Sequence, residues 1–457
     1  MARTIYWRIL QGLGANLYGQ AVVSIIQLAG VPILLYAWGV QLYGEWLILF
    51  SIPAYLSIAD LGFSQSAAND MTQKIARRDH AGALAVYQSL LALVYSAAGL
   101  GLLFITMLLF GLRFGHWLHF EELNDMQVRW VLWFLAAEVL VKLTEGASHA
   151  GFRSNGDYAL HVSINYSALL LQYLGIWALA LSGHGPMAAA GAFFAIRAVT
   201  VFLDALLLIY RHSWLKFSIY HARIAELRRL IHPALANLSM PLAMAMSTQG
   251  MVLVIGATLG ALPVVVFSTL RTMTRLVLKI VYVISDAIEP EFASAYGLHD
   301  RNLLRMLYIH MLRSTLWLVL TMAIVLLFAG SWILDLWTHS LVAMNLELFY
   351  WLVATSAASA LWYGGLVLLK AANKHMRASL LYVCTAFSAV ILSWLIVLHT
   401  SRVADVGMVL LAMDGVLATY ILRASGALCG ISASRALTEA FNPLPLLKLA
   451  KRKVHAQ

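Results

Sequence analysis

The sequence predicts an all-helical protein that crosses a membrane twelve times. Of its 457 residues, 61% are hydrophobic and only 11% are charged, whereas soluble proteins are about 25% charged. Runs without Asp, Glu, Lys or Arg cover residues 9–44, 80–112 and 230–270, and a membrane-spanning helix needs roughly 20 apolar residues. An ordinary soluble enzyme is excluded, because no soluble core could bury this much apolar surface.

The apolar runs place the twelve helices in two lobes of six. We expect the helices near residues 13–37, 44–69, 82–110, 128–150, 159–182, 187–210, 233–257, 263–289, 306–330, 346–370, 378–400 and 406–430. The expected domains are an amino-terminal lobe (1–210), a basic cytoplasmic linker (211–231), a carboxy-terminal lobe (232–432) and a basic cytoplasmic tail (433–457). Because each lobe has six helices, both lobes have the same orientation, as in a parallel internal repeat.

The basic residues predict the orientation in the membrane. With a cytoplasmic amino terminus, most of the 31 Lys and Arg residues fall in cytoplasmic segments, and only Arg113, Arg129 and Arg402 fall on the other side. This asymmetry follows the positive-inside rule. We therefore expect a multi-pass protein of the bacterial cytoplasmic (inner) membrane with both termini in the cytoplasm. The net charge of +10 then reflects orientation and indicates no nucleic-acid partner.

The linker, and the proline and glycine residues inside two of the predicted helices, can each be interpreted in two ways. Residues 215–230 of the linker form either an interfacial amphipathic helix or a solvated connection near anionic headgroups. Proline and glycine residues in helices 44–69 and 233–257 either bend these helices or serve simple packing. These residues are Pro53, Gly62, Pro241 and Gly250.

The helix at 263–289 carries a basic stripe at membrane depth. Arg271, Arg275 and Lys279 are spaced four residues apart, so successive side chains are only about 40° apart around the helix. In one interpretation they pair with acidic residues of other helices, such as the helix at 128–150. In the other they form a cationic wall that binds an anionic substrate, and arginine suits phosphate because its planar fork donates two hydrogen bonds.

Other polar residues at membrane depth are candidates for ion coupling or for lining a cavity. Charged groups there cost about 2.5–3.5 kcal/mol each and need a partner or a watery cavity. Several of these residues share one face of helix 128–150, and others share one face of helix 13–37. Both polar faces also fit structural roles in helix–helix contacts. The candidates are Asp60, Glu138, Lys142, Glu145, His149, Asn16, Gln20 and Gln27. Arg197 and Asp204, on one face of helix 187–210, are expected to form a structural ion pair.

Several motifs are missing from the sequence. There is no G-x-x-x-x-G-K-[ST] phosphate-binding loop, so the chain is not an ATP-driven pump on its own. Neither H-E-x-x-H nor G-x-S-x-G occurs, and Cys384 and Cys429 lie in separate predicted helices. We expect no cofactor, no metal and no enzymatic activity, and a secondary transporter fits these absences best.

Several short segments resemble a known family. Residues 42–46 read Leu-Tyr-Gly-Glu-Trp, and residues 55–64 read Tyr-Leu-Ser-Ile-Ala-Asp-Leu-Gly-Phe-Ser. Residues 255–268 and the Ile-Glu-Pro-Glu-Phe segment at 288–292 add a similarity in the second half. These segments resemble bacterial polysaccharide exporters, the flippases for O-antigen-type repeat units. That family belongs to the multidrug/oligosaccharidyl-lipid/polysaccharide (MOP) exporter superfamily, which also contains the MATE transporters.

The resemblance implies a two-lobed transporter that works by alternating access. Its cargo would be an undecaprenyl-diphosphate-linked oligosaccharide for lipopolysaccharide or another surface polysaccharide, and its partners would include membrane lipids, a polysaccharide polymerase and chain-length machinery. Arg271, Arg275 and Lys279 match the family's cationic cavity. Two alternatives stay open: a multidrug or organic-cation antiporter of the same superfamily, in which Glu138 or Asp60 dominates, and a membrane-embedded polysaccharide polymerase or acyltransferase.

Overall fold

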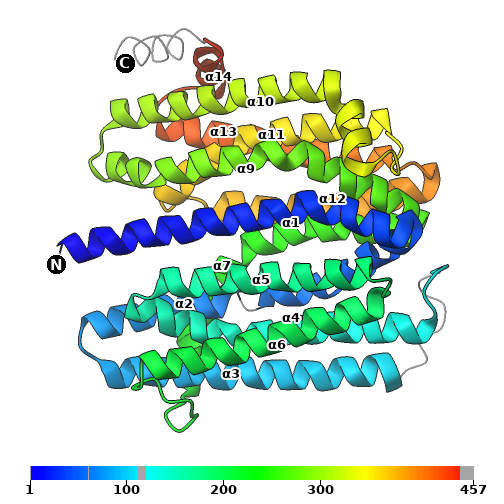
Figure 1. Ribbon diagram of the computed structural model, residues 1–457. Helices are drawn as coiled ribbons and strands as arrows, with labels where there is room; N and C mark the ends of the chain where they lie inside the picture. Colours follow the sequence, from blue (N-terminus) through cyan, green and yellow to red (C-terminus); the bar gives the residue numbers. More distant parts are fainter. Residues whose placement is uncertain (1, 60, 112–119, 443–457) are drawn as a thin grey trace, which may run out of the picture. The chain divides into compact units, whose positions relative to one another are not determined.

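The computed structural model describes residues 2–59, 61–111 and 120–442, and every regular element in these ranges is helical (Figure 1). Contacts between residues divide the chain into two compact units, Met1–Val265 and Val266–Gln457. The lobes expected from the sequence divide at residues 211–231 instead. The helices up to α8 and the first residues of α9 group with the first unit.

The first unit contains α1, the longest helical element of the described chain, and the helices α4, α5 and α6, which carry a buried group of charged side chains. In chain order its elements are α1 (Ala2–Ser51), η1 (Pro53–Ala59), α2 (Leu61–Ala76), α3 (His80–Thr106), η2 (Met107–Gly111), α4 (Asp125–Asn155), α5 (Tyr158–Leu181), α6 (Pro186–Arg211), α7 (Ile224–Ala245), η3 (Met246–Gly250) and α8 (Met251–Leu259). Helix α4 packs on α6, and α1 packs on α5.

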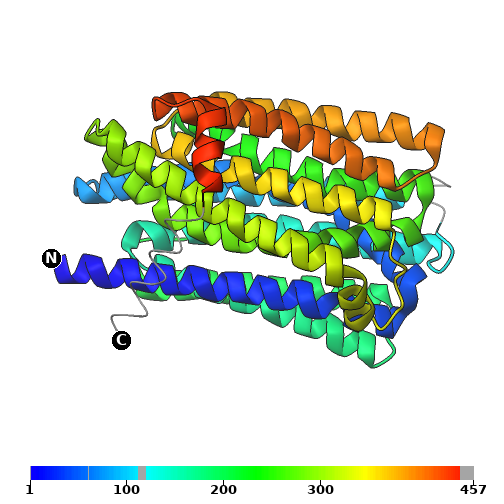
Figure 2. The same cartoon turned by 90° about the horizontal axis from the view of Figure 1, so that it is seen from above.

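The second unit is built around α11 and α13, which lie side by side (Figures 1 and 2). Its elements are α9 (Ala261–Gly297), which begins just before the boundary, α10 (Arg301–Thr338), α11 (Leu346–Ala371), α12 (Met376–Thr400), α13 (Ala404–Leu428) and α14 (Ala433–Phe441). The short helix α14 packs on α10, where Arg305 Nη2 donates to Glu439 Oε1 at 2.6 Å.

The predicted all-helical membrane fold is confirmed. Each of the twelve predicted ranges overlaps a helix of the described chain. Nine helical segments of the described residues are long and apolar enough to cross a membrane by length and composition. Helices α4 and α9, which have 31 and 37 residues, are not among these nine, and both carry the charges that the sequence places at membrane depth.

Two predicted helices are interrupted at the expected residues. Pro53 begins the short 3-10 helix η1 between α1 and α2, which fits the inability of proline to donate a backbone hydrogen bond. The π-helix η3 ends at Gly250 and separates α7 from α8; π-bulges are a recognised cause of helix bending. A further break, not predicted, lies within α1 at Gly39, which has φ 73° and thus a conformation that glycine adopts easily.

The linker is shorter than predicted and is fixed to α3. Helix α6 ends at Arg211 and α7 begins at Ile224, and residues 212–223 contain no helix. An interfacial helix over 215–230 is therefore wrong for the first half of that range. The side chain of Gln88 donates to the carbonyl of Lys216 at 3.1 Å and accepts from the backbone of His221 at 2.7 Å. A solvated connection near anionic headgroups stays a prediction.

Candidate functional site

The first unit holds a buried charge network centred on Arg197. This side chain of α6 is 1% exposed. Its Nε donates to Glu138 Oε1 at 3.0 Å and its Nη1 donates to Glu145 Oε2 at 3.4 Å. Both carboxylates are on α4, and α4 packs on α6, which explains how residues far apart in sequence meet. One guanidinium thus serves two buried carboxylates.

Two amides from α5 complete the network. Gln172, fully buried, accepts from Arg197 Nη2 at 2.7 Å and donates to Glu138 at 3.1 Å. Asn165 donates to Glu145 Oε1 at 2.5 Å. Buried charges are tolerable when every donor and acceptor finds a partner. Gln172 could not be singled out from the sequence, because it lies in a run without charged residues.

Asp204 does not pair with Arg197, which corrects the ion pair expected from the sequence. Its carboxylate instead faces His161 of α5, with 3.3 Å between Oδ2 and Nδ1. Residues seven apart share a helix face, but Arg197 is already held by the α4 carboxylates. Ligand atoms of Glu145, His161 and Asp204 lie within 4.8 Å of one another. This group could hold a cation.

The other α4 candidates line small cavities beside the network. Lys142 is exposed and lies on the wall of two cavities. One, of about 150 Å³, also has Glu138 and Arg197 on its wall. The other, of about 220 Å³, has Glu145 and His149 on its wall. All four residues of the predicted α4 face therefore lie on cavity walls, and the two carboxylates are also buried in the network.

The polar residues predicted on the first helix lie apart from this network. Asn16, Gln20 and Gln27 are exposed on α1. Asn16 accepts a hydrogen bond from the Tyr158 hydroxyl at 3.4 Å, so this contact joins α1 to α5. Asp60 lies outside the described residues.

The basic stripe of α9 forms a second cluster, within the second unit. Arg271 is 7% exposed, and its guanidinium lies 5.5 Å from the ring centre of Phe267. Among the described residues, its Nη1 has no hydrogen-bond partner. Arg275 and Lys279 are half-buried. One interpretation of the sequence paired this basic stripe with acidic residues of α4. The α4 carboxylates Glu138 and Glu145 pair with Arg197 instead.

The acid that faces this stripe is Asp414 of α13, to which the sequence analysis gave no role. It is 2% exposed and accepts hydrogen bonds from Ser359 Oγ at 2.6 Å and from Trp362 Nε1 at 3.0 Å, both on α11. Asp414 interacts electrostatically with Arg271 and Arg275. Asp414 is the one acidic residue of the range 406–430, and this was the signal available in the sequence.

Tyrosine side chains extend the cluster along α9. Tyr282 hydrogen-bonds Arg275, and its ring centre is 4.1 Å from that of Tyr363. The Tyr363 hydroxyl donates to Asp286 Oδ1 at 3.1 Å. We call Arg271, Arg275, Lys279, Tyr282 and Asp414 the α9 cluster. It holds three basic side chains and one carboxylate, and Asp286 lies beyond it on the same helix.

Comparisons with known proteins place the fold. No protein-family model and no curated protein matches the sequence. A multidrug-resistance MATE transporter of the MOP superfamily, in an inward-facing conformation, superposes with a TM-score of 0.64 at 17% identity over 90% of this chain and 94% of that chain. The fold is that of MOP-superfamily transporters.

Two further solved structures share the MOP fold. An outward-facing multidrug-resistance MATE transporter gives a TM-score of 0.55 at 16% identity, over 93% of this chain and 95% of the other. A MOP transporter from Pyrococcus furiosus, described as having a binding pocket of reversed polarity, gives 0.52 at 16% identity, over 92% and 94% of the two chains. Proteins with this fold therefore include both conformations and pockets of different polarity.

Proposed function

We propose that this chain is a secondary transporter that flips a polyprenyl-diphosphate-linked oligosaccharide across the bacterial cytoplasmic membrane by alternating access. The observation that carries the proposal is the excess of cations in the α9 cluster. Within the described residues, Arg271 and Arg275 share the interaction with the Asp414 carboxylate, and Lys279 follows one turn further along α9. Three cations at membrane depth are costly, and an anionic cargo would offset that cost during transport.

The chemistry of the α9 cluster favours a diphosphate. In the part of the chain that the structure describes, Nη1 of Arg271 is a buried donor without a partner, and arginine binds phosphate oxygens through two parallel hydrogen bonds. Tyr282 and Tyr363 add aromatic faces beside the cations, against which the apolar faces of sugar rings can pack. The proposal places the protein in the inner membrane with cytoplasmic termini, together with a polysaccharide polymerase and chain-length machinery.

Transport by reconstituted protein tests this function. Proteoliposomes loaded with lipid-linked oligosaccharide would report flipping through access of an external glycosidase to the sugar. We expect Arg271→Ala and Arg275→Ala to lower the initial rate at least tenfold. Arg423→Ala removes an exposed arginine of α13 and serves as the matched control, with a rate near that of the wild type. Wild-type rates in both α9 variants would overturn the proposal.

A second candidate function is antiport of organic cations. The group of Glu145, His161 and Asp204 favours it, as does the fold shared with multidrug-resistance MATE transporters. This function predicts that Asp204→Asn abolishes cation-driven dye efflux, while Arg271→Ala leaves the efflux intact. The two variants measured in one vesicle preparation separate the candidates, because each candidate assigns the essential charge to a different unit.

A further inference from the structure

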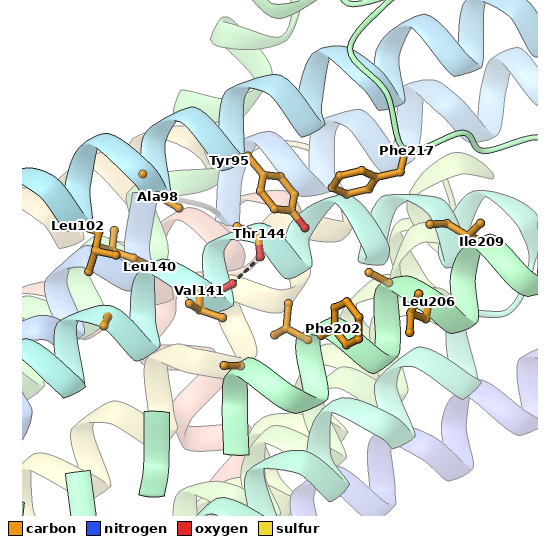
Figure 3. A pocket seen from close by; sticks show the side chains of 15 residues that line it. Tyr95, Ala98, Leu102, Leu140, Val141, Thr144, Phe202, Leu206, Ile209 and Phe217 are labelled. Atoms are coloured by element: carbon orange, nitrogen blue, oxygen red, sulfur yellow. Dashed lines mark hydrogen bonds between the residues drawn. The ribbon is translucent and has the colours of Figure 1, made fainter. Parts of the chain in front are cut away.

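An apolar groove lies on the first unit, between α3, α4 and α6 (Figure 3). Its volume is about 540 Å³, which is within the range of small-molecule sites. None of its 15 lining residues is charged. The polar side-chain groups in its wall are the hydroxyls of Tyr95 and Thr144, and Thr144 donates to the carbonyl of Val141 at 2.7 Å.

Small side chains create the groove. Ala98 and Gly99 of α3 face Ala137 of α4 and Ala198 of α6 across it. A Cβ added at Gly99 would meet no atom within 4 Å, so the space beside this residue is open. Phe202 of α6 is 63% exposed although it lines the groove. Within the hydrocarbon core of a bilayer an apolar surface of this kind is covered by hydrocarbon chains.

The groove has the length of one membrane leaflet. Along α6 its lining runs from Ala198 to Ile209, and these eleven steps (209 − 198) at about 1.5 Å each give roughly 17 Å. Half of the hydrocarbon core of a bilayer is about 15 Å thick. Helices α3 and α6 are both long and apolar enough to span a membrane. The groove therefore suits one extended hydrocarbon chain.

At one end of the groove the linker contributes to its wall, next in sequence to a basic residue. Phe217 of the linker closes this end, with its ring 5.3 Å from that of Tyr95 in an edge-to-face arrangement (Figure 3). The neighbouring Lys216 is exposed, while its backbone carbonyl is held by Gln88. Ile219 and Tyr220, further along the linker, are 68% and 86% exposed. Exposed apolar side chains next to basic ones are typical of segments at the membrane surface.

We propose that this groove binds one acyl chain of an anionic glycerophospholipid, with Phe217 over the chain and Lys216 at the headgroup phosphate. The uncharged walls select a hydrocarbon chain, and the basic end selects a negative headgroup. The site is independent of the cargo proposed above, because it uses neither the α9 cluster nor the Arg197 network.

An acyl chain bound in the groove would stabilise the two helices that carry the Arg197 network. The groove residue Ala137 directly precedes Glu138 of the network in sequence, and the groove residue Ala198 directly follows Arg197. The two sets lie on different faces of the same pair of helices, α4 and α6. Filling the groove stabilises the packing of α4 on α6, since an empty apolar surface lacks the contacts that a packed one makes.

Photocrosslinking of the full chain tests this site. Wild-type protein in nanodiscs would contain phosphatidylglycerol with a diazirine on one acyl chain, and labelled peptides would be quantified by mass spectrometry. We expect labelling concentrated on the peptides that carry Tyr95, Phe202 and Phe217. Gly99→Phe fills the groove and should lower this labelling at least fivefold. Leu100→Phe, on the next residue of α3, which is 68% exposed and outside the groove, should leave it unchanged.

Further variants keep the test decisive. Ala98→Leu fills the same space and replaces Gly99→Phe if that variant does not fold. Lys216→Gln should lower labelling by phosphatidylglycerol but not by phosphatidylcholine. Labelling that is equal on all lipid-facing helices, or unchanged by both groove-filling variants, would overturn the proposal. Displacement by a polyprenyl diphosphate but not by unlabelled phosphatidylglycerol would overturn the choice of occupant.

Discussion

Lys74 of α2 and Glu226 of α7 form an ion pair, with 3.3 Å between Nζ and Oε2. Arg229 also binds Glu226, at 2.8 Å, and pairs with Asp70 of α2. Four charged residues therefore fasten α2 to α7 near the predicted cytoplasmic surface. Both helices belong to the first unit, so these charges stabilise the packing inside that unit.

We expect Glu226→Gln to loosen the contact between α2 and α7. The variant removes the carboxylate that both Lys74 and Arg229 bind. Partly exposed pairs of this kind contribute about 0.2–1 kcal/mol each, so the loss of two of them should raise the open fraction by up to about thirtyfold. The measurement is the maleimide labelling rate of Met71→Cys, a position fully buried on α2, in a background that carries Cys384→Ser.

Arg228→Gln is the matched control for this experiment. Arg228 is exposed beside Arg229 and forms no ion pair within the described part of the chain. Its variant should label at the rate of the parent. High salt should act like Glu226→Gln, because exposed charges are screened within about 8–10 Å at physiological ionic strength. An unchanged rate in Glu226→Gln would show that these four charges do not fasten α2 to α7.

Arg197 holds the Glu138 and Glu145 carboxylates, and we expect Arg197→Met to be among the most destabilising substitutions in the chain. Two buried carboxylates would lose their counter-charge, and breaking a buried pair in this way costs about 3–5 kcal/mol. Unfolding in mixed micelles, followed by tryptophan fluorescence, would measure the change. Arg197→Lys keeps the charge but not the fork, so its loss should be smaller.

Arg211→Gln provides the comparison for the Arg197 variants. Arg211 pairs with Asp157 at 3.1 Å, but its side chain is 46% exposed. Its loss should cost less than about 1 kcal/mol, since exposed ion pairs contribute little. If Arg197→Met were as stable as Arg211→Gln, the network would have no structural role, and its charges would have to be explained by function alone.

The sequence predicts the helices well because charge-free runs and basic loops follow directly from the bilayer as solvent. It predicts the partners of buried charges poorly. Arg197 and Asp204 share a helix face, yet Arg197 binds Glu138 and Glu145 and leaves Asp204 to His161. These choices depend on how α4, α5 and α6 pack, and helical periodicity within one helix contains no information on that packing.

Gly44 makes a close approach that should tolerate no side chain. A Cβ at this position of α1 would lie 2.5 Å from the backbone oxygen of Ala261. We expect Gly44→Ala to lower the free energy of unfolding by about 1–3 kcal/mol, because backbone atoms cannot move aside as a side chain can. Gly14→Ala, also in α1, meets nothing within 4 Å and should be neutral or stabilising. Equal stability of the two variants would contradict this interpretation.

Asp414 limits how strongly the α9 cluster attracts an anion, so its neutralisation should strengthen binding of a diphosphate. Asp414→Asn removes the negative charge that faces Arg271 and Arg275. A change of about 1–2 kcal/mol in their interaction with a bound anion corresponds to roughly 5- to 30-fold in affinity. Farnesyl diphosphate, titrated by calorimetry in detergent, is a suitable probe, with farnesol as the uncharged comparison.

The control for charge is Asp405→Asn, in the first turn of the same helix α13, which should leave the affinity for farnesyl diphosphate unchanged. Ser359→Ala and Trp362→Phe remove the hydrogen bonds to Asp414 but keep its charge. Each should lower stability by about 1–3 kcal/mol, because a buried carboxylate loses a donor, without the gain in affinity. If Asp414→Asn only destabilised the protein and left diphosphate binding unchanged, Asp414 would serve packing of α11 on α13 and not the charge balance of the α9 cluster.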